Sequence, residues 1–218
     1  DYDEGRVKHV KVALSAAMFG SGEAVETGLA YIHAMAHHQE QAGATFLDIN
    51  VDEFSLKTEE QKAAMTWLVG AVQNVSPLPI SVDSSDVNVI RAGLEACDSS
   101  KGRPMLNSAS LERIDALDLV LEHNAEVVIT AAGETGMPSG TAERVTNASR
   151  MVDTAVEKGI PISHLHVDPL VFPISVNKEF GLHCLDAIRE IRSKYGPEIH
   201  ITGGMSNVSF GIPGRKIV

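Results

Sequence analysis

The feature that most constrains the fold is a repeat in which a short run of β-branched and apolar residues is followed by a longer amphipathic stretch. Six such runs occur along the 218 residues of the chain. Parallel strands need crossover connections, usually helices, so this alternation is typical of a parallel sheet. The predicted strands are Thr45–Val51, Leu78–Ser84, Pro104–Ser110, Glu126–Ala131, His164–Leu170 and Glu198–Gly204.

The stretches between these runs carry apolar residues at three- and four-residue spacing, which indicates amphipathic helices. Gly43 and Gly159 stand where two of these helices are expected to end, and Thr58 with Gln61 has the spacing of a capping box at the start of a third. The predicted helical stretches are Val7–Phe19, Gly22–Ala42, Thr58–Val75, Asp86–Ala96, Glu112–Glu122, Thr141–Lys158 and Lys178–Tyr195.

Strand–helix units in series, with no GxGxxG after the first strand, favour a TIM (β/α)8 barrel over a doubly wound sheet. A closed barrel has eight strands and typically about 250 residues. No linker, low-complexity tract or change of composition divides the sequence. We therefore predict one barrel domain over residues 1–218, with strand 1 and strand 8 of the barrel outside this chain.

Charge and composition exclude several classes of partner. The formal net charge is −11 and aromatic residues make up 5% of the chain, which disfavours nucleic acid and anionic membrane surfaces as partners. The apolar runs are too short for a transmembrane helix, and the acidic start does not resemble a signal peptide. Cys97 and Cys184 form neither a disulfide framework nor a zinc spacing. These features predict a cytoplasmic protein.

Polar residues recur at the C-terminal ends of five predicted strands, where barrel enzymes place their active sites. Any one aspartate there is often only a helix cap, but the recurrence is harder to explain that way. Since side chains alternate along a strand, shared faces are predicted for Asp48 with Asn50, Ser81 with Asp83, and His166 with Asp168. Carboxylates and amides without a paired nucleophile and base suit a flat, nitrogen-rich heterocycle such as a pterin.

The segments FLDINVDE, ISVDSSD, LNSAS, HVDPL and GGMSNVSFGIPGR occur in this order between Thr45 and Arg215. Together they resemble the pterin-binding domain of methyltetrahydrofolate methyltransferases, a group that includes the folate domain of cobalamin-dependent methionine synthase. The resemblance implies a TIM barrel that transfers the N5-methyl group of 5-methyltetrahydrofolate to a Co(I) corrinoid. The chain has no DxHxxG corrinoid motif, so the corrinoid is expected on a partner protein or cobalamin domain. Homodimers are common in this family.

The resemblance also implies roles for individual residues, all of them at predicted strand ends or in the last motif. Asn207 would lie beside N5 and donate an amide N–H as the methyl group leaves, which makes it the predicted catalytic residue. Asp168 would accept the 2-amino and N3–H pair of the pterin. The remaining predicted substrate-binding residues are Asp83 and Asn107 on the ring, Arg215 near the pterin or Asn207, and Asp48 and Asn50 at the pocket floor.

Other interpretations remain open at this stage. A dihydropteroate synthase shares the fold and pterin pocket, but it should carry a loop with glycine and arginine where this chain has Asp52-Glu53-Phe54-Ser55. A metal-dependent barrel hydrolase would use His164 and His166, which alternate on one predicted strand and could hold Zn²⁺ with His200. Alternatively these histidines fill the barrel interior or hydrogen-bond the pterin-binding carboxylates, and we predict no metal site. A non-catalytic folate-binding module of a longer corrinoid enzyme is the third interpretation.

Overall fold

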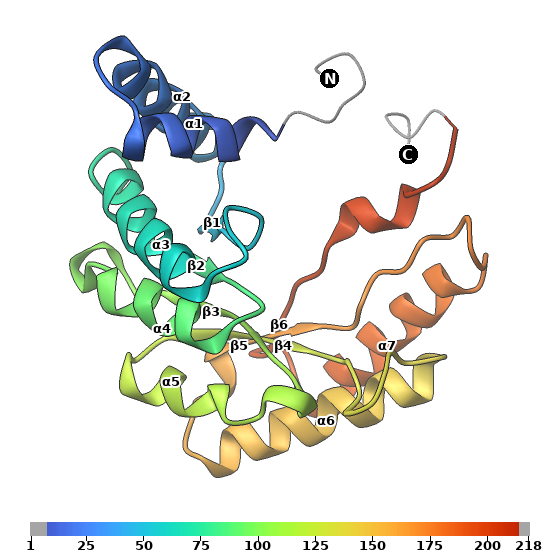
Figure 1. Ribbon diagram of the computed structural model, residues 1–218. Helices are drawn as coiled ribbons and strands as arrows, with labels where there is room; N and C mark the ends of the chain where they lie inside the picture. Colours follow the sequence, from blue (N-terminus) through green and yellow to red (C-terminus); the bar gives the residue numbers. More distant parts are fainter. Residues whose placement is uncertain (1–7, 214–218) are drawn as a thin grey trace. The chain divides into compact units, whose positions relative to one another are not determined.

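A computed structural model describes residues 8–213 of the chain (Figure 1). It is an α/β structure whose six strands follow one another in chain order in the sheet, β1-β2-β3-β4-β5-β6. The pairs β1–β2, β2–β3, β4–β5 and β5–β6 all run parallel. The chain forms two compact units, residues 1–107 and residues 108–218.

The first unit begins with two helices and then alternates strands with helices. Leu47 and Ile49 of its first strand are buried, whereas Asp48 and Asn50 alternate with them on the opposite face of that strand. The elements are α1 His9–Phe19, α2 Glu23–Gln41, β1 Leu47–Asn50, α3 Thr58–Gln73, β2 Ile80–Asp83, α4 Val87–Ala96, the 3₁₀ turn η1 Ser99–Lys101 and β3 Met105–Ala109.

Helices α1 and α2 lie side by side, and a glycine sets how closely they approach (Figure 1). A Cβ atom at Gly28 would stand 2.5 Å from the carbonyl oxygen of Ala13 and 2.8 Å from the amide nitrogen of Ala17. Both distances are far inside van der Waals contact, so any larger residue would push the two helices apart.

The second unit continues the same alternation of strands and helices. Its interior is built from β-branched strand residues such as Val127, Ile129 and Val167, which are all fully buried. The elements are η2 Leu111–Arg113, α5 Ala116–Glu122, β4 Glu126–Thr130, α6 Thr141–Glu157, η3 Ile162–His164, β5 Leu165–Asp168, α7 Phe180–Tyr195, β6 His200–Ile201 and η4 Met205–Ser209.

The predicted strands are confirmed, although β6 is only two residues long. The helix ends at Gly43 and Gly159 are confirmed too, since both glycines have positive φ, +86° and +94°, just beyond α2 and α6. The helix expected from Glu112 begins only at Ala116, because Leu111–Arg113 forms a 3₁₀ turn. No helix within residues 8–213 is long and apolar enough to cross a membrane.

The predicted capping box of α3 is wrong. Lys57 occupies the N-cap position, so Thr58 is already the first helical residue. The Thr58 hydroxyl donates instead to Asp86 Oδ2 at 2.9 Å. Gln61 Nε2 donates to the carbonyl oxygens of Asp52 and Ser55, at 3.0 and 2.8 Å. The pair therefore fixes the loop between β1 and α3 and the start of α4 rather than the backbone of its own helix.

Candidate binding site

Three polar side chains stand in one row across the strands of the first unit. Asn50 of β1 is in register with Asp83 of β2, and Asp83 is in register with Asn107 of β3. Asn50 Nδ2 donates to Asp83 Oδ2 at 3.0 Å. Parallel strands in register present the same face to each neighbour, so the row forms a continuous polar edge toward the strand ends.

Asp48, two residues before Asn50 on β1, also bonds to this row. Its Oδ1 atom accepts a hydrogen bond from Ser81 Oγ at 2.6 Å and another from Asn107 Nδ2 at 3.2 Å. Ser81 is buried and lies in register with Asp48. The four residues predicted from this half of the chain, Asp48, Asn50, Asp83 and Asn107, are thus brought together.

Asp52 ties the loop after β1 to the end of β2, a role that the sequence analysis missed. Its Oδ1 atom accepts from Ser84 Oγ at 2.5 Å, and its Oδ2 atom accepts from the Ser85 amide at 2.8 Å. Its own amide donates to Asn50 Oδ1 at 2.8 Å. The signal in the sequence was the Asp-Ile-Asn-Val-Asp pattern, followed by the paired serines of ISVDSS. The last aspartate of the pattern supplies the acceptor, and the two serines supply the donors.

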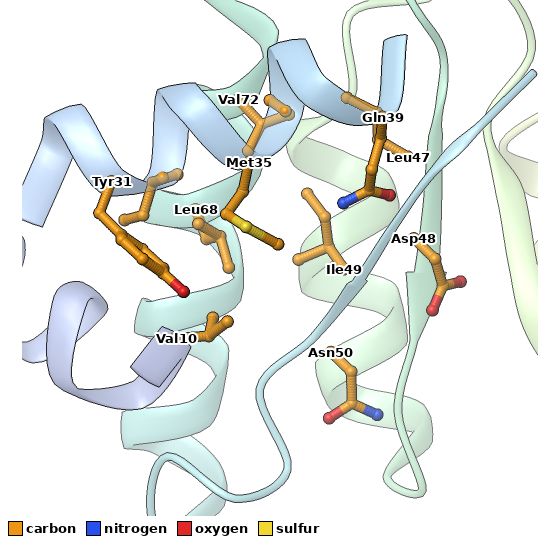
Figure 2. Close-up of a pocket in the computed structure, with 12 residues that line it drawn as sticks. Val10, Tyr31, Met35, Gln39, Leu47, Asp48, Ile49, Asn50, Leu68 and Val72 are labelled. Atoms are coloured by element: carbon orange, nitrogen blue, oxygen red, sulfur yellow. The ribbon is translucent and has the colours of Figure 1, made fainter. Parts of the chain in front are cut away.

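A cavity of about 290 Å³ lies on the helix-facing side of β1 (Figure 2). Ile49 points from the strand toward Met35 and Leu68, whereas Asp48 lies on the opposite side of the strand. Most of the other lining residues are apolar side chains of α1, α2 and α3. The polar lining residues of the cavity include Gln39, Asp48 and Asn50, and Asp48 points away from it, so the cavity offers few polar groups to orient a heterocycle. We therefore place the candidate chemistry at the polar row and not in this cavity.

In the second unit, Asp168 ends β5 and is in register with Thr130 of β4. Its Oδ1 atom accepts a hydrogen bond from the Leu170 amide at 2.7 Å. Burial raises the pKa of the Asp168 carboxyl group above its ordinary value, and the Leu170 N–H partly opposes this by stabilising the ionised form. The carboxylate is therefore partly desolvated and held by the backbone.

The two glycines after β6 leave room for Asp168 and for Asn207. A Cβ atom at Gly203 would stand 3.3 Å from Asp168 Oδ1, and one at Gly204 would stand 2.9 Å from Asn207 Nδ2. Asn207 itself lies in η4 and is exposed. The Gly-Gly pair thus lets a carboxylate and an amide approach the backbone at neighbouring positions, a spacing that a larger residue at either position would disturb.

The histidines do not form the predicted pair on one strand. His164 lies in η3, before β5 begins, so the alternation assumed for a zinc site is wrong. His166 Nε2 lies 2.6 Å from Glu126 Oε2, and its ring stacks on His200 with centroids 4.6 Å apart. Burial lowers the pKa of His166. Among residues 8–213, no three His, Cys, Asp or Glu side chains are grouped so that they could hold a metal ion.

The predicted residues are thus divided between the two units. Asp48, Asn50, Asp83 and Asn107 belong to the first, and Asp168 and Asn207 belong to the second. Arg215 lies outside the residues that the structure describes. The chemical roles given to these seven residues remain predictions.

Comparison with known proteins identifies the class. The profile of the family described as pterin binding enzyme matches residues 20–217 of this chain. A methylcorrinoid:tetrahydrofolate methyltransferase of Eubacterium limosum is 31% identical over 195 residues, which cover 87% of this chain and 69% of that protein. A methionine synthase of Mycobacterium leprae is 34% identical over 191 residues, covering 82% of this chain but 15% of that protein. The chain belongs to the pterin-binding enzyme family.

Solved structures of dihydropteroate synthases share the fold. The Xanthomonas albilineans enzyme in complex with 7,8-dihydropteroate has a TM-score of 0.64 at 23% identity, covering 87% of this chain and 67% of that one. The Vibrio fischeri enzyme has a TM-score of 0.66 at 19% identity, covering 92% of this chain and 74% of that one. At this identity the likeness is one of fold, and it confirms the predicted α/β class of the pterin enzymes.

Proposed function

We propose that this chain transfers the N5-methyl group of 5-methyltetrahydrofolate to a Co(I) corrinoid carried on a partner protein or cobalamin domain. The observation that carries the proposal is the in-register row Asn50–Asp83–Asn107, in a chain of the pterin-binding family. The relative named methylcorrinoid:tetrahydrofolate methyltransferase supports the choice of methyl transfer within that family.

The proposed binding roles follow from hydrogen-bond chemistry. Asp168 offers a partly desolvated carboxylate, the complement of the two parallel N–H groups on the 2-amino-4-oxo edge of a pterin. Asp83 and Asn107 offer an acceptor and a group that both donates and accepts, suited to the other ring nitrogens and the carbonyl. Asp48 and Asn50 hold Asn107 and Asp83 in place through the hydrogen bonds described above.

Asn207 is proposed to act at N5. In the transfer, the electron pair of the cobalt forms the new bond to the methyl carbon, and the pair of the N5–methyl bond returns to N5. N5 becomes a better leaving group as it accepts a hydrogen bond, which an amide N–H of Asn207 can donate. An amide is not a net acid, so water supplies the proton that N5 gains. Arg215, eight residues later, is proposed to contact the pterin or support Asn207.

The direction of transfer is a separate question from the site. The name of the Eubacterium limosum relative describes the opposite direction, from methylcorrinoid to tetrahydrofolate. The same groups serve both directions, because each step of a catalysed reaction is retraced in reverse. The final methyl acceptor is therefore set by the partner that carries the corrinoid, and the methionine synthase relative is an example in which this region is 15% of a longer chain.

The test combines binding with transfer. Calorimetry measures the affinity of the full protein for 5-methyltetrahydrofolate, and visible absorbance follows methylation of free Co(I) cobalamin. We expect Asp83→Ala and Asn107→Ala each to weaken folate binding by about tenfold, the effect of one hydrogen bond to a charged group or buried ring edge. Asp98→Ala, an exposed cap of η1, is the control that should leave binding unchanged. If Asp83→Ala and Asn107→Ala bind folate as tightly as the parent protein does, the proposal is contradicted.

The second candidate is a dihydropteroate synthase activity, favoured by the fold likeness to those enzymes. Against it, the loop after β1 is occupied by the bonds of Asp52 to Ser84 and Ser85 and has no arginine between β1 and α3. The assay supplies 4-aminobenzoic acid with an activated dihydropterin and looks for 7,8-dihydropteroate. Formation of that product without methyl transfer would favour the second candidate.

A further inference from the structure

Arg144 of α6 is the largest fully buried side chain among the described residues, with 0% of its surface exposed. Its hydrogen bonds within that part of the chain go to carbonyl oxygens and not to carboxylates. Nε donates to Pro169 at 2.9 Å, Nη1 to Gly140 at 3.1 Å, and Nη2 to Leu170 at 3.5 Å. Burying a guanidinium without a carboxylate partner is unfavourable, so its position calls for an explanation.

Two of these carbonyls belong to the residues that directly follow Asp168. Leu170 has a φ angle of +67°, a conformation that branched and bulky residues seldom adopt. In that conformation its amide points back and donates to Asp168 Oδ1 at 2.7 Å. The guanidinium thus binds the carbonyl groups of a turn whose Leu170 N–H orients the carboxylate.

The guanidinium is itself held in place from the other side. Its central carbon lies 4.6 Å above the ring of Phe172, within the range of a cation–π contact. The Phe172 ring in turn packs edge-on against Phe180 of α7, with centroids 5.3 Å apart. Helix α6 and the turn after β5 therefore meet at Arg144, and Phe172 links them to helix α7.

We propose that Arg144 is a positioning residue for the pterin-binding carboxylate, acting on Asp168 through the Pro169–Leu170 turn. The inference rests on the proposed function, since it matters only if Asp168 binds the pterin. It assigns a residue that touches no substrate but fixes which way Asp168 Oδ1 faces, and so leaves the rest of the carboxylate to accept the N–H groups of the ring.

The test is a double-mutant cycle on the full protein with 5-methyltetrahydrofolate as the probe. Arg144→Lys keeps the charge but loses the three-way fork. We expect it to weaken folate binding about tenfold in the parent, comparable to the loss of one charged hydrogen bond, and to leave the residual affinity of the Asp168→Asn protein unchanged. Arg150→Lys, the same change on an exposed arginine of α6, is the matched control.

A second readout separates positioning from mere stabilisation. Loss of the Leu170 N–H bond removes an interaction that lowers the Asp168 pKa, so the pKa rises. As the pH is lowered, Arg144→Lys should therefore lose folate binding at a higher pH than the parent does. Cys184 of α7 interacts electrostatically with both Asp168 and Arg144, and His166 lies two residues before Asp168 on the same strand. Cys184→Ser should leave the shift in place.

Phe172→Leu provides the same test without changing the buried charge. It loosens the guanidinium by removing the ring beneath it, and we expect a three- to fivefold loss of affinity that is again absent in the Asp168→Asn background. If the folded variants lose affinity equally in both backgrounds, or lose none, the positioning role is wrong. If Asp168→Asn itself does not affect folate binding, the proposed pterin-binding role of Asp168 is wrong. That result differs from the one that would contradict only the positioning role of Arg144.

Discussion

The polar residues at the strand ends are held in two different ways in the two units. In the first unit, side chains hold side chains: Asn50 bonds Asp83, and Ser81 and Asn107 bond Asp48. In the second unit, the backbone holds the side chain: Leu170 N–H fixes Asp168, whose carboxyl group is partly buried and has a raised pKa. Asp48 keeps a second side-chain hydrogen bond if either Ser81 or Asn107 is removed, whereas Asp168 is oriented by the Leu170 N–H bond. The difference therefore predicts unequal sensitivity to mutation.

The largest effect on the rate of methyl transfer is expected from Asn207→Ala. If the Asn207 amide donates to N5 during transfer, its removal should slow methyl transfer by about 100-fold, the scale found when one transition-state donor is lost. Thermal stability should change little because Asn207 is exposed, and folate affinity should change little if its hydrogen bond to N5 strengthens only as the methyl group leaves. Stopped-flow absorbance of Co(I) cobalamin measures the rate. Asn74→Ala, another exposed asparagine, should have no effect.

Gly204→Ala should have the next largest effect. The new Cβ would lie 2.9 Å from Asn207 Nδ2, so the amide must move. We expect about a tenfold slower transfer, since a displaced donor retains part of its interaction. Gly136→Ala is the matched control because nothing lies within 4 Å of its added Cβ. Equal rates for the two variants would separate Asn207 from the chemistry.

Asn50→Ala tests the network of the first unit. It removes the 3.0 Å bond to Asp83 and the acceptor of the Asp52 amide. We expect folate affinity to fall about threefold, the effect of roughly 0.7 kcal/mol, because Asp83 keeps its strand position. A loss as large as that for Asp168→Ala, measured by the same calorimetric titration, would remove the distinction between the units.

The smallest effect is expected on the free energy of unfolding of Asp168→Asn, where the sign of the change tests the account. The pKa of Asp168 is raised in the folded chain, so its contribution to stability is present below the ordinary value of 3.8 and is lost as pH rises through the raised pKa. Asp168→Asn should therefore raise the free energy of unfolding slightly at neutral pH, with the gain vanishing in acid. Urea denaturation between pH 3 and pH 7 measures it.

Asp86 should behave in the opposite way. The Asn88 amide and the Thr58 hydroxyl bond its carboxylate and lower its pKa, so its stabilising contribution is present at neutral pH and is lost as pH falls. Asp86→Asn should lower the free energy of unfolding at neutral pH. If both variants shift stability in the same direction, the contrast between the two carboxylates is wrong.

The sequence predicted the fold well where the alternation of side chains or a helix-ending glycine determines the structure locally. Alternation placed Asp48 with Asn50 on one face of β1, and Gly43 and Gly159 marked helix ends by their positive φ. It was wrong where the start of a helix depends on tertiary partners: Thr58 bonds Asp86, 28 residues away. His164 lies before β5 for a different, local reason, since residues Ile162–His164 form a 3₁₀ turn after Pro161.

Arg144 and the Leu170 turn could not be predicted from the sequence. Positive φ at a leucine has no sequence signature, because glycine or asparagine is expected there. The one weak signal was an arginine in the N-terminal part of α6, where the helix dipole disfavours a cation. Its burial depends on α6, the turn after β5 and Phe172 coming together, which only the folded chain reveals.

The central claim is that Asp168 binds the pterin of 5-methyltetrahydrofolate. Its most direct test is a calorimetric titration of the full protein and of Asp168→Ala, with Asp118→Ala, an exposed aspartate paired with Lys158, as the control. We predict that the parent and the control bind alike and that Asp168→Ala loses about 2–4 kcal/mol, a bidentate charged contact plus the unpaired ring edge. Unchanged binding by a folded Asp168→Ala protein would contradict the account.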